Sequence, residues 1–341
     1  MSLPRHPLTA TSLLLLLLLV IACSQQDQDE TLVVYSAGPR VLAEQVAEAF
    51  ESEKGVRVEL FAATTGQVMA RLEAERYRPR ADVVVFASRS AAEALKQDGR
   101  LLAYPNPDWW EDSREEWHDP DQYYFATSAA LVGMALRADK DENLDWATVF
   151  AGEGPGRVTM PSPSRSGSAG DFLVAYSLQR GEAAARDDFR AARQHGLIFS
   201  AANSQAISGL VVGTYDVILA AADYLIYRQI DAGADIRMHY PPSGSALVER
   251  PVAVLADTPV PQLARHFVDF YLSEAMQEAV AAQHLLPART GVEPSALRRH
   301  AEAPATFDVD PVAAWEQQAT ILRRFQIRVE RAEVLPAEST P

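Results

Sequence analysis

The sequence predicts an α/β fold of two lobes, each a mostly parallel sheet flanked by helices, with two crossover strands between them. Units of strand, short polar loop and helix follow one another from residue 31. Several strands are continuously apolar, as in residues 83–86, which is typical of parallel strands buried on both faces. Two long extended segments, 125–134 and 238–255, interrupt this alternation and indicate lobes linked twice.

The first residues predict export. Arg5 precedes an apolar run over 13–22, about half of the roughly 20 residues that a membrane-spanning helix needs, and Cys23 follows. The sequence Val-Ile-Ala-Cys is similar to a bacterial lipobox, which implies cleavage before Cys23 and lipidation of its thiol. We therefore expect a signal peptide over 1–22, a lipid-anchor linker over 23–30 and a periplasmic or cell-surface lipoprotein. An ordinary signal peptide with an incidental cysteine is the alternative.

Composition indicates a globular protein held together by its core. Hydrophobic residues make up 48% of the chain, and the length suits two domains. Cys23 is the only cysteine, so neither an internal disulfide nor a thiolate metal site is expected. The formal net charge of -15 disfavours nucleic acid as a partner, because its phosphates would meet a repulsive field.

The first lobe opens with three strand-loop-helix units. Pro39 suits the first turn of the first helix, since its missing N–H would be unpaired there anyway. A loop-rich stretch with Trp109 and Trp110 then leads to the first crossover; this pair could stack on a sugar or base, but packing of the loop is the favoured interpretation. The strands of the three units are predicted at 31–35, 56–62 and 81–86.

The second lobe repeats the pattern. Strands are predicted at 157–160 and 217–220, with helices from Asp171 and from Asp223. The second crossover returns the chain to the first lobe, which helices over 261–282 and 312–331 are expected to complete. The predicted boundaries are 31–127 with 246–341 for lobe 1, and 128–245 for lobe 2.

Four loops that follow strands consist largely of Ser, Thr and Gly. In an open α/β sheet such loops lie at the carboxyl ends of the strands, where ligands bind. Each precedes a helix, so hydroxyl groups, free backbone N–H groups and the positive end of a helix dipole would converge. These features predict an oxyanion site, with simple helix capping as the alternative. The loops are Ser36-Ala37-Gly38, Thr64-Thr65-Gly66, Ser88-Arg89-Ser90 and Ser166-Gly167-Ser168.

A fifth group of candidate ligand-binding residues follows the second-lobe strand predicted at 217–220. Asp223 and Tyr224 begin a helix, and Tyr227 shares a helix face with Tyr224. Asp223 would accept hydrogen bonds from ligand hydroxyls or an amine, with Tyr224 closing over the ligand. An N-capping aspartate followed by two packing tyrosines explains the same residues equally well.

Motifs of enzymes are missing from the sequence. It has no Gly-x-Ser-x-Gly elbow before a helix, no Gly-x-x-x-x-Gly-Lys-Ser/Thr loop and no His-Glu-x-x-His helix. The seven histidines are scattered, without triad or metal-ligand spacing. We therefore predict a binding protein, with no catalytic residue, no cofactor and no metal site.

With these residues laid out, the chain resembles the bacterial extracellular solute-binding proteins with the type II periplasmic-binding fold. It is most similar to the branch that contains ferric-iron, hexose-phosphate, phosphonate and thiamine binders of ABC importers. The resemblance implies that Ser36, Thr64, Thr65, Ser166, Gly167 and Ser168 hold an oxyanion and that Asp223 and Tyr224 hold the rest of the ligand. It rests on Val34–Pro39, Ala63–Leu72, Ala81–Val84, Met160–Pro163, Ser166–Ala169, Asp223-Tyr224, Pro242–Ser245 and Leu286–Thr290.

The sequence departs from the iron-binding pattern of that branch. Ferric binders there use adjacent tyrosines, often with a histidine and a carboxylate, because a hard cation prefers anionic oxygen ligands. Here Ala37-Gly38, Ala87-Ser88 and Asp223-Tyr224 stand at the matching positions. A phosphorylated organic compound is therefore the expected ligand, with ferric iron and thiamine or thiamine phosphate as alternatives.

The resemblance also implies partners and a mechanism. The lobes are expected to close over the small-molecule ligand, and the closed form to dock as a monomer on an ABC permease driven by its ATPase. The membrane would be contacted through the lipid anchor only. A ligand sensor that docks on a signalling receptor, and a surface enzyme acting on phosphate esters, are the competing hypotheses.

Overall fold

The computed structural model describes residues 30–140, 143–299 and 304–332. Its strands are β1 (Thr31–Ser36), β2 (Arg57–Ala62), β3 (Val83–Val85), β4 (Tyr124–Arg137), β5 (Val158–Pro161), β6 (Ile198–Ser200), β7 (Val217–Ala222), β8 (Ile236–His239), β9 (Ala246–Val254) and β10 (Leu286–Pro287). Its α-helices are α2 (Arg40–Lys54), α3 (Thr65–Ala74), α4 (Arg89–Gln97), α5 (Trp146–Phe150), α6 (Gly167–Arg180), α7 (Glu182–Gln194), α8 (Asn203–Val211), α9 (Asp223–Asp231), α10 (Pro261–Tyr271), α11 (Glu274–Ala282), α12 (Ala296–Arg299) and α13 (Pro311–Phe325). The predicted signal peptide and Cys23 lie outside the described residues.

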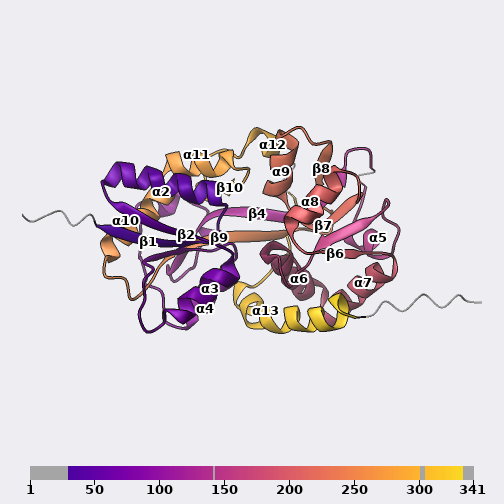
Figure 1. The fold of residues 1–341 in the computed structure, drawn as a ribbon, viewed down its shortest axis with the longest axis horizontal. Helices are drawn as coiled ribbons and strands as arrows, with labels where there is room; N and C mark the ends of the chain where they lie inside the picture. The colour runs from indigo at the N-terminus through magenta and orange to yellow at the C-terminus, as the bar shows by residue number, and fades with distance from the viewer. Residues whose placement is uncertain (1–29, 141–142, 300–303, 333–341) are drawn as a thin grey trace, which may run out of the picture.

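The strands form one mixed sheet that runs through both halves of the molecule (Figure 1). Its order is β2-β1-β3-β9-β4-β7-β5-β6, and β8 and β10 also pair with β4. In the first half β1 pairs in parallel with β2 and β3, and in the second half β5 pairs in parallel with β6 and β7. The predicted α/β fold with parallel sheets is thus confirmed, but the crossovers join the two sheets into one.

The two crossovers, β4 and β9, pair with each other in the middle of the sheet. They run antiparallel from Tyr124 opposite Ala253 to Val132 opposite Ala246. Beyond Val132, β4 continues into the second half, where it pairs with β7 and β8. The chain passes between the halves along these two neighbouring strands, so a change in their twist would rotate one half against the other.

Each half has its own hydrophobic core. In the first half Phe50 of α2 packs edge-on against Phe267 of α10, with ring centroids 5.1 Å apart. In the second half Trp146 lies against Phe172 of α6, with centroids 4.5 Å apart, and its indole N–H donates to the carbonyl of Gly244 at 2.7 Å. Aromatic pairs in these geometries add to the hydrophobic stabilisation of each core.

Some helix termini follow local sequence signals. Gly55 ends α2 in the left-handed conformation, with φ of 68°, which glycine adopts without strain. Thr64 and Gln67 form a capping box at the start of α3. Two predictions of helix bounds were wrong: α6 begins at Gly167, four residues before Asp171, and the helix predicted over 261–282 is two helices, α10 and α11.

The C-terminal helix differs from its predicted place. It was expected to complete the first lobe, but Ile321 and Phe325 of α13 belong to the hydrophobic core of the second half. Figure 1 shows α13 along the lower side of the molecule, beneath α6. This helix also contacts α4 of the first half, so it touches both halves. The remaining lobe boundaries stay a prediction.

Candidate functional site

The predicted ligand loops lie at the ends of parallel strands from both halves. Ser36 ends β1, and Ser88 precedes α4 after β3. From the other half, Ser166 precedes α6 after β5, and Asp223 begins α9 after β7. The hydrogen bond from Ser88 to Asp171 of α6 shows that strand ends of the two halves face one another. This is the arrangement in which ligands bind to open α/β sheets.

The first-half loops are bonded to one another. Ser36 accepts a hydrogen bond from the Gly38 amide at 3.1 Å. Thr64 serves as a helix cap, as the capping interpretation proposed, whereas Thr65 accepts from the Ala87 amide at 3.4 Å and so ties the second loop to the third. A methyl group added at Gly66 would have no neighbour within 4 Å, so the chain leaves open space at that point.

The second-half loop surrounds the N-terminus of α6. Ser166 caps this helix by accepting from the Ala169 amide at 3.3 Å, and its hydroxyl lies 3.2 Å from that of Ser168. Asn203 of α8 bonds to both hydroxyls, at 3.0 and 3.3 Å. Space is open at Gly167, and the first amide groups of a helix have no acceptor inside it. Asn203 was not predicted from the sequence, although it follows the end of β6, as the other loops follow their strands.

Asp223 is fully buried and already bonded within the protein. Its carboxylate accepts hydrogen bonds from the Leu131 amide at 3.1 Å and the Tyr240 hydroxyl at 3.0 Å, and it forms an ion pair with Arg298. Burial raises the pKa of Asp223, and the charge of Arg298 opposes this shift. In this conformation the carboxylate anchors α9 to the crossover strand β4. Contact between the Asp223 carboxylate and a ligand stays a prediction.

The neighbouring tyrosines are held in the neutral form. The hydroxyl groups of Tyr227 and Tyr240 lie 3.1 Å apart, and burial raises the pKa of both. The charge of Asp223 adds to both shifts. Neutral phenols are weak ligands for a hard cation, which prefers anionic oxygens. Among the described residues, no group of three or more His, Cys, Asp or Glu side chains could hold a metal ion.

An arginine that the sequence analysis missed lies between the predicted loops of the two halves. Arg250 of β9 is only 6% exposed, and its Nη2 donates to the carbonyl of Ala37 at 3.3 Å. Its guanidinium carbon lies 5.5 Å from the centroid of the Tyr224 ring. Glu249 and Arg250 are consecutive charged residues in an otherwise apolar crossover, and this was the signal that would have found it.

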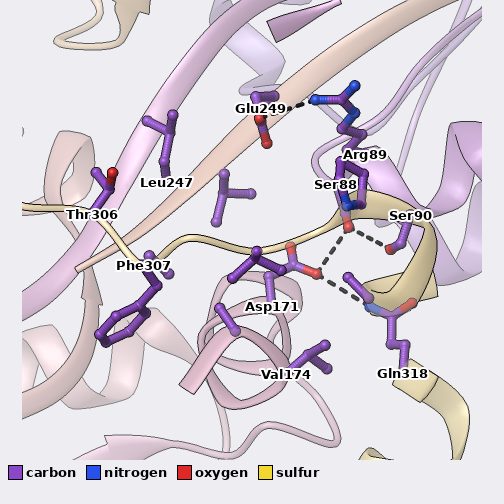
Figure 2. Close-up of a pocket in the computed structure, with 16 residues that line it drawn as sticks. Ser88, Arg89, Ser90, Asp171, Val174, Leu247, Glu249, Thr306, Phe307 and Gln318 are labelled. Carbon is purple, nitrogen blue, oxygen red and sulfur yellow. Dashed lines mark hydrogen bonds and ion pairs between the residues drawn. The ribbon is translucent and has the colours of Figure 1, made fainter. Parts of the chain in front are cut away.

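A cavity of about 140 Å³ lies beside β9, between α4, α6 and α13 (Figure 2). Glu249 lines it and pairs with Arg89 at 3.3 Å. Ser88 donates to Asp171 of α6 at 2.9 Å, so the two halves are bonded there. The cavity takes in Ser88 but neither Ser166 nor Asp223, and it is therefore separate from most of the predicted site.

Trp109 and Trp110 pack inside the first half. Trp109 is 6% exposed, its ring contacts Phe125 with centroids 5.1 Å apart, and its indole N–H donates to Asp269 at 2.9 Å. The packing interpretation of this pair is supported. Within the described residues, no helix combines the length and apolar character needed to cross a membrane.

Comparisons with known proteins agree with this architecture. The model of the family described as bacterial extracellular solute-binding protein matches residues 31–285. A curated relative, the probable ABC transporter periplasmic-binding protein y4fP of Sinorhizobium fredii, is 24% identical over 319 residues, which cover 89% of this chain and 87% of the relative.

Solved structures share the fold at low identity. The periplasmic binding protein AfuA of Actinobacillus pleuropneumoniae, solved with fructose-6-phosphate, has a TM-score of 0.78 and 20% identity, covering 89% of this chain and 99% of that one. Iron-bound HitA of Pseudomonas aeruginosa has a TM-score of 0.76 and 20% identity, covering 86% and 98%. Because the family model matches most of the chain, this protein belongs to the bacterial extracellular solute-binding proteins.

Proposed function

We propose that this protein is the substrate-binding component of an ABC importer and that it captures a small anionic compound, such as a sugar phosphate or a phosphonate, between its two halves. The closed form would deliver this ligand to a membrane permease that a cytosolic ATPase drives. The curated relative carries an ABC-transporter name, and one structural neighbour was solved with fructose-6-phosphate. The name supports the transport role, whereas the neighbour, at 20% identity, supports the fold alone.

The arrangement of polar groups at the start of α6 is the observation from which we infer an anionic ligand. There, the hydroxyls of Ser166 and Ser168, the side-chain amide of Asn203 and the N-terminus of a 14-residue helix gather at one point. Helix N-termini bind phosphate groups because their N–H groups and dipole both favour negative charge. Open space at Gly167 lets a ligand approach the backbone closely.

Ferric iron is the less favoured alternative. Iron-bound HitA shares the fold, but at 20% identity this similarity does not indicate which ligand the present chain binds. In the present chain the carboxylate of Asp223 is bound to Arg298, and burial keeps Tyr227 and Tyr240 protonated. Thiamine phosphate remains a candidate because its phosphate suits the same helix terminus. A sensor that docks on a receptor would bind its ligand in the same way and differs only in its partner.

We further propose that the protein is exported and anchored through lipid on Cys23, with no other membrane contact. The support is the lipobox-like sequence ending at Cys23. Metabolic labelling with a fatty-acid analogue tests this: wild type should incorporate label and Cys23→Ser should not. Equal labelling of both would contradict the anchor.

Ligand binding is tested by thermal denaturation of the protein expressed from Ser24 onward. The probes are inorganic phosphate, fructose 6-phosphate, aminoethylphosphonate, thiamine phosphate and ferric citrate. A binding probe at 100 times its Kd should add about 2.7 kcal/mol of stability. Ser168→Ala should reduce the shift caused by a phosphate compound, and the exposed neighbour Ser204→Ala should not.

The outcomes separate the candidates. A shift with ferric citrate alone, together with a tyrosinate-iron absorption band, would refute the anion proposal. Turnover of the bound phosphate ester would instead support the enzyme hypothesis. Asp223→Ala is a poor probe here, because removing this buried carboxylate leaves Arg298 unpaired and destabilises the protein whatever the ligand.

A further inference from the structure

Arg250 is a buried cation without a carboxylate partner among the residues that the structure describes. Two arginines in the described part of the chain have less than a tenth of their surface exposed, Arg250 at 6% and Arg298 at 5%. Arg298 forms an ion pair with Asp223. Arg250 has no carboxylate oxygen within 4 Å among the described residues, and its hydrogen bond is to the carbonyl of Ala37. Asp171 is influenced by the charge of Arg250 but makes no ion pair with it.

Burial of the Arg250 guanidinium is unfavourable unless other contacts compensate for its lost hydration. A guanidinium stays protonated in proteins, and taking a cation out of water costs several kcal/mol when no counter-ion is supplied. One backbone carbonyl and the face of the Tyr224 ring recover part of this cost. The remaining donors of the guanidinium can bind an anion that enters from outside.

The position of Arg250 shows where that anion would be. Ala37 belongs to the loop after β1, and Tyr224 to the start of α9 in the other half. Neighbouring residues of a strand point to opposite faces, and Arg250 is not among the residues that line the cavity beside Glu249. The guanidinium therefore lies at the junction of the two halves, beside residues that the sequence predicted to hold the ligand.

We propose that Arg250 is the specificity-determining residue of the site and supplies the positive charge that binds the oxyanion of the ligand. This rests on the proposed function and narrows it: the substrates are compounds with a phosphate, phosphonate or comparable planar or tetrahedral oxyanion, and their uncharged counterparts do not bind. A guanidinium suits such groups because its parallel N–H bonds match two oxygens at once.

The test compares wild type with Arg250→Met and Arg250→Lys. Thermal denaturation is followed with inorganic phosphate, fructose 6-phosphate and fructose. We expect Arg250→Met to weaken apparent affinity for the two phosphate compounds about 10- to 100-fold, the effect of losing charged hydrogen bonds. Arg250→Lys keeps the charge but loses the planar fork, so its loss should be smaller. Fructose should bind to none of the three.

Arg265 provides a matched control. Its Nη2 donates to the Ala103 carbonyl at 3.2 Å and its guanidinium carbon lies 5.3 Å from the centroid of the Tyr104 ring, the same pair of contacts that Arg250 makes. It lies on α10, away from the junction of the halves. Arg265→Met should therefore leave the phosphate response unchanged.

The melting temperature of Arg250→Met without ligand gives an independent test. Arg250→Met removes a buried unpaired charge, so the variant without ligand should melt no lower than wild type. If wild type responds to phosphate compounds and Arg250→Met responds equally, the role of Arg250 is refuted while the proposed function stands. If wild type responds to none of the anionic probes, aminoethylphosphonate and thiamine phosphate included, both are refuted. A lower melting temperature with an unchanged phosphate response would show that Arg250 only braces the two halves.

Discussion

Replacement of Asp171 by asparagine should change how the stability of this protein depends on pH. Oδ1 of Asp171 accepts hydrogen bonds from Ser88 at 2.9 Å and Gln318 at 3.2 Å, and its buried Oδ2 has no hydrogen-bond partner in the described part of the chain. Burial raises the pKa of Asp171 to about 7; the Ser88 hydrogen bond and Arg250 oppose this shift, and Glu249 adds to it. The ionised carboxylate is therefore unfavourable at the junction of the halves.

The direction and size follow from proton linkage. An aspartate in the unfolded chain has a pKa of about 3.9, so between about pH 4 and pH 7 the folded protein holds a proton that the unfolded chain has lost. Stability should fall as pH rises through this window, and the loss is complete above pH 7. At 1.36 kcal/mol per pKa unit, the three units between these values give an upper limit of about 4 kcal/mol.

The asparagine of the Asp171→Asn variant carries no charge and does not take part in this titration. Its NH2 group, placed where Oδ2 has no partner, leaves two buried N–H groups unpaired, which costs about 1–3 kcal/mol at every pH. The difference in unfolding free energy between Asp171→Asn and wild type should therefore move in favour of the variant from pH 4.5 to pH 8, by up to about 3 kcal/mol. Urea denaturation at five pH values measures it.

Asp139→Asn is the control, since its side chain is 57% exposed. Its difference from wild type should be nearly constant with pH. Parallel pH profiles for wild type and Asp171→Asn would refute the reasoning. They would show that the carboxylate at the junction is hydrated, or that the contact with Ser88 is broken in solution.

Three further predictions concern single groups. Thr64→Ala should cost about 1 kcal/mol in unfolding free energy, because the capping box of α3 is lost; no change in urea denaturation would contradict it. His118 should stay neutral down to about pH 4, because burial lowers its pKa to about 4 and the charge of Arg89 adds to the shift. The stability of the folded protein should then be lost as pH falls from about 6.5 to about 4. An NMR titration midpoint of His118 near pH 6.5 would refute this. Asp223→Ala should cost about 3–5 kcal/mol without ligand, since Arg298 is left buried and unpaired; a variant as stable as wild type in the same denaturation would show that the pair is not formed.

The sequence was sufficient for the fold class and for the position of the loops. Apolar runs such as residues 83–86 can be buried on both faces only in a covered, mostly parallel sheet. Short polar loops between strands and helices then place Ser36, Ser88, Ser166 and Asp223 at the strand ends. These conclusions depend on local periodicity and turn chemistry, which each segment carries in its own residues.

Other features depend on contacts between distant residues. The sequence does not show that Asp223 is bound by Arg298, 75 positions later in the printed sequence, or that Asp171 meets Ser88 across the two halves. The C-terminal helix has an apolar face that would suit either half, and only the packing of Ile321 and Phe325 in the second core decides between them.

Arg250 shows most clearly which features the sequence determines and which depend on the tertiary structure. The sequence by itself determined that a charged pair interrupts an apolar crossover, and it determined which loops end the strands. Whether a buried charge has a counter-ion depends on the positions of all side chains within a few ångströms, because Coulomb energy and desolvation are set by distance and surroundings and not by sequence spacing. Only the tertiary structure placed Arg250 beside Ala37 and Tyr224, with no carboxylate of the described residues paired to it.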